Sequence, residues 1–347
     1  MVYRNMSKYE KSLECYKSVV ESMPGSEYAE ESMIAIESIY HKMKKPEKFL
    51  EYVEANDLAL KRTDAEKEKM YFSTAEQLYL SGNYQQAIAT LGKFIENYPQ
   101  SPDMTQAVFY LAESYRETGD KEKACAEYAK VMNAESSLSF VEMSKLRYAQ
   151  LSFDLQRYSD AYNGYLALSE TTRIENNRTV AREGMMLSAY KSKDYDKAVI
   201  AATAVVSDVD ADKDTKTEAK YIKAKSLLAT SKRSEAMKLF AELGAVPSSP
   251  RGAESKYLLI QNLFDTADFD AVESEVYDFS QKSGNQSYWL AKAYLVLGDS
   301  FVERGLYDQA KATYESIGEG YQAPSAGDDI ADNVKKRLDR LAGLMEN

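Results

Sequence analysis

The chain has 347 residues and a formal net charge of −11, with 44 lysines and arginines against 55 aspartates and glutamates. Binding to nucleic acid requires clustered cations that neutralise phosphates, so this composition argues against a nucleic-acid partner. His41 is the only histidine, which removes histidine-activated nucleophiles and multi-histidine metal centres. No apolar stretch approaches the roughly 18 residues that span a bilayer. We therefore expect no enzymatic activity, no cofactor, no metal and no transmembrane segment.

An apolar residue, usually alanine, recurs along the chain with steps of 37, 37, 37, 38, 36 and 38 residues. The recurring residues are Ala87, Ala124, Ala161, Ala198, Ala236, Val272 and Ala310. A fixed period in the range of about 20–50 residues indicates a solenoid, in which each unit buries its apolar face only against its neighbours. The function of such a chain depends on a long surface.

The chain begins inside one of these repeats. Counting back from Ala87 by the same step reaches Phe49 and then Ser12. The residues around Ser12 fit the second helix of a helix pair, with Tyr9, Tyr16, Val19 and Pro24 in place. Only Met1–Ser7 remains for the first helix of that pair. Either a shortened cap begins here or the chain is a piece of a longer protein, and the pattern favours the piece.

The following copies share a helix–turn–helix pattern. In the copy around Ala87 it is carried by Tyr71, Ala75, Leu78, Gly82, Tyr84, Leu91 and Pro99. Later copies hold Val108, Leu111, Ala112, Tyr115, Gly119, Tyr128 and Val131, then Tyr148, Ala149, Tyr158, Tyr165 and Leu168, then Tyr195 and Val205. These residues resemble the tetratricopeptide repeat, although Phe94 stands where that family usually has alanine.

The resemblance implies an all-α fold, a right-handed superhelical solenoid of antiparallel helix pairs. We expect residues 1–327 to form one array of about eight helix pairs plus a partial N-terminal repeat, and residues 328–347 to form a C-terminal capping helix. The extra residues of these long repeats fall between helix pairs, as in Asn97–Pro102 and Val246–Pro250. Such spacers are similar to those of bacterial envelope proteins with this repeat, which implies the periplasm or cell envelope, with the cytoplasm as the alternative.

Two features along the chain suggest chemistry but have a plainer interpretation. The alternating carboxylates of Asp208–Asp214 resemble the start of a calcium loop, yet Lys213 and Ala219 stand where that loop needs glycine and glutamate. We expect a solvated turn, with Asp214 or Thr215 capping the next helix. Cys15 and Cys125 lie three repeats apart, too far to form a disulfide, and are expected to be small packing residues.

The last copy shows the pattern most clearly. Tyr294, Leu297 and Phe301 fall on one helical face, and Ala310, Tyr314 and Ile317 fall on a second. Gly305 can adopt the positive φ that ends the first helix, and the small Ala310 lets the second helix approach closely.

The chain is expected to end in a capping helix. Ile330, Val334, Leu338, Leu341 and Leu344 form one apolar stripe. The charged residues Lys335, Lys336, Arg337, Asp339 and Arg340 are expected to face solvent. A solenoid has to cover its last apolar face, and this helix has the pattern for that role.

The resemblance also implies a binding surface. In the tetratricopeptide family the first helix of each pair lines the concave face, and the matching positions here are largely aromatic. The candidates for partner binding are Phe72, Tyr79, Phe109, Glu113, Arg116, Gln150, Phe153, Tyr190, Tyr221, Lys225, Tyr257, Gln261 and Phe264. Aromatic side chains dominate interface hot spots, but the same rings also suit the core of a tightly coiled superhelix, and both interpretations stay open.

These observations predict a non-catalytic scaffold that binds a peptide or protein segment on an aromatic concave groove. The alternative is an architectural subunit of a larger bacterial envelope assembly, which would use the edges of the array or further N-terminal repeats. A peptide would bind to the first and not to the second.

Overall fold

The computed structural model describes residues 8–43, 45–56, 58, 63–134, 139–323 and 328–346. In these ranges the chain forms 18 α-helices and no strand. The predicted all-α class is therefore confirmed. The first helix expected for the N-terminal repeat, over Met1–Ser7, lies outside the described residues.

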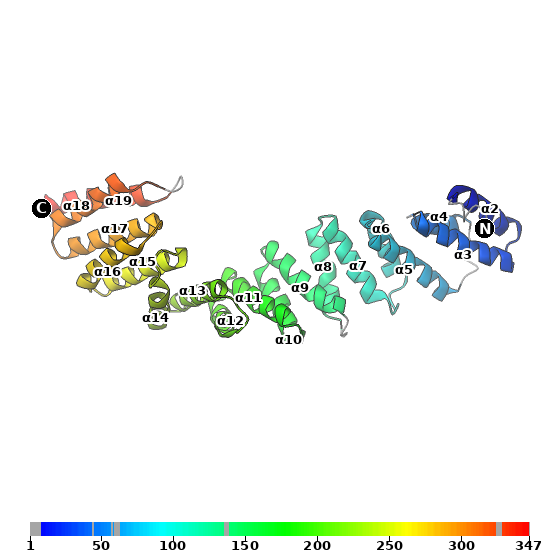
Figure 1. Ribbon diagram of the computed structural model, residues 1–347, viewed down its shortest axis with the longest axis horizontal. Helices are drawn as coiled ribbons and strands as arrows, with labels where there is room; N and C mark the ends of the chain where they lie inside the picture. Colours follow the sequence, from blue (N-terminus) through cyan, green and yellow to red (C-terminus); the bar gives the residue numbers. More distant parts are fainter. Residues whose placement is uncertain are drawn as a thin grey trace. The chain divides into compact units, whose positions relative to one another are not determined.

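The helices divide into two compact units, Met1–Arg173 and Ile174–Asn347. In each unit the helices pack side by side in chain order, as the ribbon shows (Figure 1). The first unit contains α2 (Tyr9–Ser22), α3 (Glu27–Lys42), α4 (Glu47–Ala55), α5 (Asp64–Leu80), α6 (Tyr84–Asn97), α7 (Met104–Glu117), α8 (Lys121–Met132), α9 (Ser139–Asp154) and α10 (Tyr158–Thr171). The single array proposed over residues 1–327 stays a prediction.

The second unit continues the same alternation of first and second helices. It contains α11 (Glu175–Lys191), α12 (Tyr195–Ser207), α13 (Lys213–Ala229), α14 (Arg233–Gly244), α15 (Pro250–Asp265), α16 (Phe269–Lys282), α17 (Ser287–Glu303), α18 (Tyr307–Gly320) and α19 (Ile330–Met345).

The recurring alanines and valine are packing residues, as predicted. Each is the fourth residue of a second helix, from Ala87 in α6 to Ala310 in α18. All seven side chains are fully buried, with an exposed fraction of 0%. A small side chain at this point lets the two helices of a pair approach, and a larger one would overfill the contact.

The turn between the two helices of a pair needs a left-handed residue. Gly305 adopts φ 72° there, as the sequence predicts. At the matching turn that precedes α16, Ala267 has φ 57° although it carries a Cβ. The turn is therefore imposed by the packing of the two helices, and glycine only lowers its conformational cost.

Helix α19 packs against α17 and α18 at the end of the second unit, but its stripe differs from the prediction. Ile330, Val334 and Leu341 are buried against α17 and α18. Leu344 remains 38% exposed. Arg337 does not face solvent as expected, because its guanidinium pairs with Asp299 of α17, with Nη2 and Oδ2 2.8 Å apart. The amphipathic pattern correctly located the helix. It could not identify the partner of Arg337, because Asp299 lies 38 residues away in the sequence.

Two local predictions were wrong. Cys15 is exposed, whereas Cys125 is buried as expected. The helix after the acidic turn is capped by Asp212 instead of Asp214 or Thr215, because the Asp212 carboxylate accepts a hydrogen bond from the Thr215 amide at 2.7 Å. Asp212 is the last residue with extended backbone before α13, which is the geometry of an N-cap.

Candidate functional site

The predicted site residues of the first unit lie on α5, α7 and α9, the first helices of three successive pairs. Their rings are joined by Tyr110, which the sequence analysis did not select. Tyr110 stacks on Tyr79 with the ring centres 4.4 Å apart and on Phe72 with the centres 6.5 Å apart. Its hydroxyl donates a hydrogen bond to Glu76 at 3.1 Å. The only signal for Tyr110 in the sequence was its position directly after Phe109 on the same helix.

Glu113 lies beneath these rings and is buried. Its carboxylate accepts hydrogen bonds from Tyr128 and from Arg116, the latter at 2.7 Å. Burial, followed by the hydrogen bond and charge of Glu113, raises the pKa of Tyr128 far above its usual range. Glu113 therefore links α7 to α8 through Tyr128 and orients the side chain of Arg116.

The remaining candidates of the first unit are half-buried. Phe109 lies 5.6 Å from Phe140 and 6.3 Å from Tyr128, measured between ring centres. Phe153 meets the ring of Tyr158, edge to face, with the ring centres 5.2 Å apart. Gln150 accepts a hydrogen bond from Arg147 at 3.5 Å. Phe109 is consequently a packing residue with one accessible side, whereas Phe153 is the less embedded ring.

In the second unit, Tyr221 and Lys225 of α13 belong to a charged cluster. Tyr221 is buried, with the Arg251 guanidinium 4.2 Å from its ring centre. Lys225 forms an ion pair with Glu254 of α15 at 3.1 Å. A cation over an aromatic face is held by the ring quadrupole. The cluster joins successive first helices and leaves Lys225 partly accessible.

Tyr257 marks a second aromatic group of this unit. Its ring centre lies 5.4 Å from that of Trp289, which in turn meets Tyr288 edge to face at 5.0 Å. Burial raises the pKa of Tyr257, and the nearby cations Lys292 and Arg337 oppose that rise. The sequence analysis missed Trp289 because its candidates end at Phe264 of α15, and none was selected on α17.

Phe264 lines a pocket of about 430 Å³ formed by α15, α17, α18 and α19. The pocket also contains Asp299 and Val302 of α17 and Arg337 of α19. Gln261, one turn before Phe264, donates a hydrogen bond to Asp265 at 3.0 Å. The face made by the first helices thus continues up to the capping helix.

A repeated aromatic pair borders this face at the turn of four helix pairs. The pairs are Tyr79–Tyr84, Phe153–Tyr158, Tyr190–Tyr195 and Phe264–Phe269, with ring centres 6.1, 5.2, 6.2 and 5.9 Å apart. Tyr84, Tyr158 and Tyr195, which carry the repeat pattern at the start of second helices, are half-buried. Burial raises the pKa of Tyr79 and Tyr190 above the usual range, so these hydroxyls remain protonated and can donate hydrogen bonds at neutral pH.

The acidic turn of the second unit gathers three carboxylates. Ligand oxygens of Glu175, Asp208 and Asp210 lie within 4.8 Å of one another. Arg182 already supplies a positive charge there, with Nη1 2.7 Å from Asp208 and 3.7 Å from Glu175. The arginine explains why these carboxylates converge, but the expectation of a solvated turn is wrong for Asp208, whose side chain is 2% exposed.

Among the helices that the structure describes, none combines the length and the apolar character needed to cross a membrane. The candidate residues on the first helices carry aromatic, amide and charged side chains, and most of them contact another polar or aromatic side chain. In each unit taken by itself, we call the surface formed by the first helices the first-helix face: α5, α7 and α9 form it in the first unit, and α11, α13, α15 and α17 form it in the second.

Family models described as tetratricopeptide repeat match residues 75–136 and residues 288–321. A search of curated proteins gives no match. Among solved structures, the chain is similar to a tetratricopeptide repeat protein from Parabacteroides merdae, at 15% identity over 79% of this chain and 99% of that chain, with a TM-score of 0.36.

Two further solved structures are similar at the same level. The TPR domain of P58(IPK) is 14% identical over 99% of this chain and 96% of that chain, with a TM-score of 0.30. The apo form of the quorum sensor NprR from B. thuringiensis is 14% identical over 92% of this chain and 99% of that chain, with a TM-score of 0.33. The family matches thus identify tetratricopeptide repeats in two parts of the chain, on α5–α8 and on α17–α18.

Proposed function

We propose that this tetratricopeptide-repeat protein is a non-catalytic interaction scaffold, and that it binds a peptide or protein segment along the first-helix face. The observation that carries the proposal is the recurrence of half-buried aromatic rings on successive first helices. A ring that is already held by its neighbours loses little side-chain entropy when a partner covers its open side.

The polar groups beside these rings support recognition of a segment with a defined register. Gln150 and Gln261 offer amides. Lys225 and Arg116 offer cations whose side chains are 29% and 31% exposed, respectively. A partner that buries apolar side chains on the rings gains about 25 cal/mol per Å². Its backbone or polar side chains can then pair with these groups, which sets position more than affinity.

Glu113 and Tyr221 enter this proposal as supporting residues. Both are buried, so a partner reaches Arg116 and Lys225 instead of the groups that orient them. The other candidates are partly accessible and are proposed to contact the partner: Phe72, Tyr79, Phe109, Arg116, Gln150, Phe153, Tyr190, Lys225, Tyr257, Gln261 and Phe264.

The test is a pull-down from the source cell's extract with mass spectrometry, followed by calorimetry with the purified partner. The variant carries Phe153→Ser, Tyr190→Ser and Phe264→Ser, because each of these rings is partly accessible and meets another ring at its own helix turn. The matched control carries Tyr28→Ser and Ile200→Ser, which are 67% and 68% exposed and lie on α3 and α12, two helices not assigned to this face.

We expect the triple variant to stay folded and to bind the partner at least about tenfold more weakly for each ring that acts as a hot spot. The control variant is expected to bind like the original chain. If both variants retain the partner equally, binding occurs elsewhere, and an architectural role through the edges of the repeats becomes the better explanation.

A further inference from the structure

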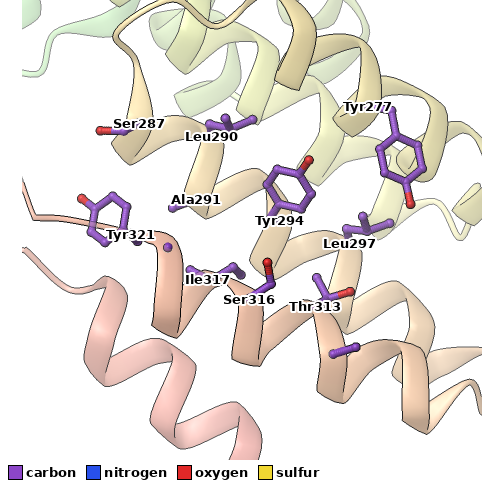
Figure 2. Close-up of a pocket in the computed structure, with 12 residues that line it drawn as sticks. Tyr277, Ser287, Leu290, Ala291, Tyr294, Leu297, Thr313, Ser316, Ile317 and Tyr321 are labelled. Carbon is purple, nitrogen blue, oxygen red and sulfur yellow. The ribbon is translucent and has the colours of Figure 1, made fainter.

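We propose that the second unit has another docking groove, between α17 and α18, which binds a short uncharged apolar segment of a partner protein. The groove has a volume of about 500 Å³ and is shown in Figure 2. Leu290, Leu297 and Ile317 form its apolar base, and Tyr277 of α16 and Tyr294 of α17 stand at its rim. Its lining includes none of the candidate residues for partner binding on the first-helix face, although α17 contributes to both surfaces.

The same place in neighbouring helix pairs is closed by an ion pair. Tyr294 lies 16 residues before Ala310, and the residues at that spacing before Val272 and Ala236 are Lys256 and Lys220. Lys256 reaches Asp278 of α16 at 2.8 Å. Lys220 reaches Glu242 of α14 at 2.8 Å. Asp278 and Glu242 both stand at the position that Ser316 occupies in α18.

The pair α17–α18 therefore replaces a lysine and a carboxylate with Tyr294 and Ser316. The serine is too short to reach across the groove, and the tyrosine stands at the rim (Figure 2). One wall of the groove is formed by three small, exposed residues, Ala312, Ser316 and Gly320. Each is separated from the next by four residues and so lies on one face of α18. The groove is open because its closing ion pair is missing.

The chemistry of the lining selects an uncharged partner segment. None of the 12 described residues that line the groove carries a charge, in a chain whose net charge is −11. Moving a charged side chain onto this surface would remove its water without supplying an opposite charge. The hydroxyls of Tyr277 and Tyr294 can instead pair with peptide groups of a bound segment.

The size of the groove selects a short segment instead of a second copy of this chain. A stable interface between two proteins uses about 20–30 residues on each side, and this groove offers 12. From Ser287 to Leu297, α17 advances by about 15 Å along its axis. That length fits two or three apolar side chains of a helix or an extended peptide.

The test is a methyl NMR titration of the full chain, labelled at alanine, isoleucine and leucine. The probe is the peptide acetyl-Gly-Leu-Ser-Phe-Gly-amide, and its matched control has aspartate in place of leucine and phenylalanine. We expect saturable shifts of the Leu290, Leu297 and Ile317 methyls at millimolar or lower concentration with the apolar peptide. The acidic peptide is expected to cause none.

Two kinds of variant decide the assignment. Tyr294→Lys with Ser316→Asp rebuilds the ion pair of α15–α16 and is expected to weaken the binding at least tenfold, whereas Ser316→Ala is expected to preserve it. If the double variant does not fold, Ala312→Leu narrows the groove from an exposed position. No saturable shift in the original chain, or equal shifts after closure of the groove, would overturn the proposal. Leu146 of α9 and Leu187 of α11 are partly buried leucines on first helices. Shifts confined to their methyls would place the peptide on the first-helix face instead.

Discussion

Arg337 of the capping helix α19 forms a two-pronged contact with Asp299 of α17. Its Nε donates a hydrogen bond to Oδ1 of the carboxylate and its Nη2 donates one to Oδ2, each at 2.8 Å. Tyr314 of α18 donates a third hydrogen bond to the same carboxylate at 2.7 Å. Burial by itself lowers the pKa of Arg337, but the hydrogen bonds and charge of Asp299 outweigh it and raise the pKa. One carboxylate thus ties three helices together.

We predict that Arg337→Met destabilises the second unit by about 1.5–3 kcal/mol, because it leaves a partly buried carboxylate without its charged partner. The free energy of unfolding from urea denaturation measures this. Lys336→Met is the matched control, since Lys336 is exposed on the same helix, and it should change stability by less than about 0.5 kcal/mol. Equal losses in the two variants would contradict a specific role for the Arg337–Asp299 contact.

Gly298 in α17 is predicted to resist substitution for a steric reason. A Cβ at this position would lie 2.3 Å from Cε1 of the buried Tyr314 ring. Gly298→Ala should therefore cost about 1–3 kcal/mol in unfolding free energy, despite the higher helix propensity of alanine. In Gly92→Ala on α6 the new Cβ meets nothing within 4 Å, and stability should rise by about 0.5–1 kcal/mol. Thermal unfolding of both variants checks the opposite signs.

In the left-handed turn before α16, glycine should make the folded protein more stable than alanine does. Ala267 has φ 57°, and Gly305 occupies the matching turn with φ 72°. We predict that Ala267→Gly stabilises the chain by up to about 1 kcal/mol, and that Gly305→Ala destabilises it by a similar amount. Ala204→Gly, at an exposed helical position in α12, should instead cost about 1 kcal/mol. A loss of stability in Ala267→Gly would show that the turn does not strain its alanine.

The ion pair between Lys256 and Asp278 should make the free energy of unfolding depend on pH. The hydrogen bonds from Lys256 and then Lys282 lower the pKa of Asp278 to about 2. Because this folded-state pKa lies below the unfolded value of about 3.9, the stabilisation is fully present above about pH 4 and is lost as the pH falls through about 2. The Asp278 side chain is 37% exposed, so the contribution should stay below about 1 kcal/mol.

Denaturation of Asp278→Asn and of the original chain between pH 6 and pH 2 measures this effect, and the difference between the two should shrink toward the acid end. Asp339→Asn, at an exposed position on α19, serves as the control and should keep a constant difference. A gap between Asp278→Asn and the original chain that does not change with pH would rule out the titration of Asp278 as its source.

The sequence by itself determined the helix pairs and their main packing points. The spacing of Ala87, Ala198 and Ala310 located the fourth residue of three second helices, because a helix pair permits only a small side chain at its closest approach. Gly305 marked a turn, because a left-handed residue favours glycine. These features depend on local geometry, which repeats with the chain and can be read from the order of residues.

Only the tertiary structure decided how polar and aromatic side chains are used. Glu113 has the spacing of a groove residue but is buried under Arg116, and Arg337 has the spacing of a solvent-facing residue but binds Asp299. Tyr110 and Trp289 contribute rings that the spacing did not select. A long side chain reaches several ångströms in a direction set by its neighbours, and those neighbours come from other helices. Periodicity therefore places its backbone, while packing chooses its partner.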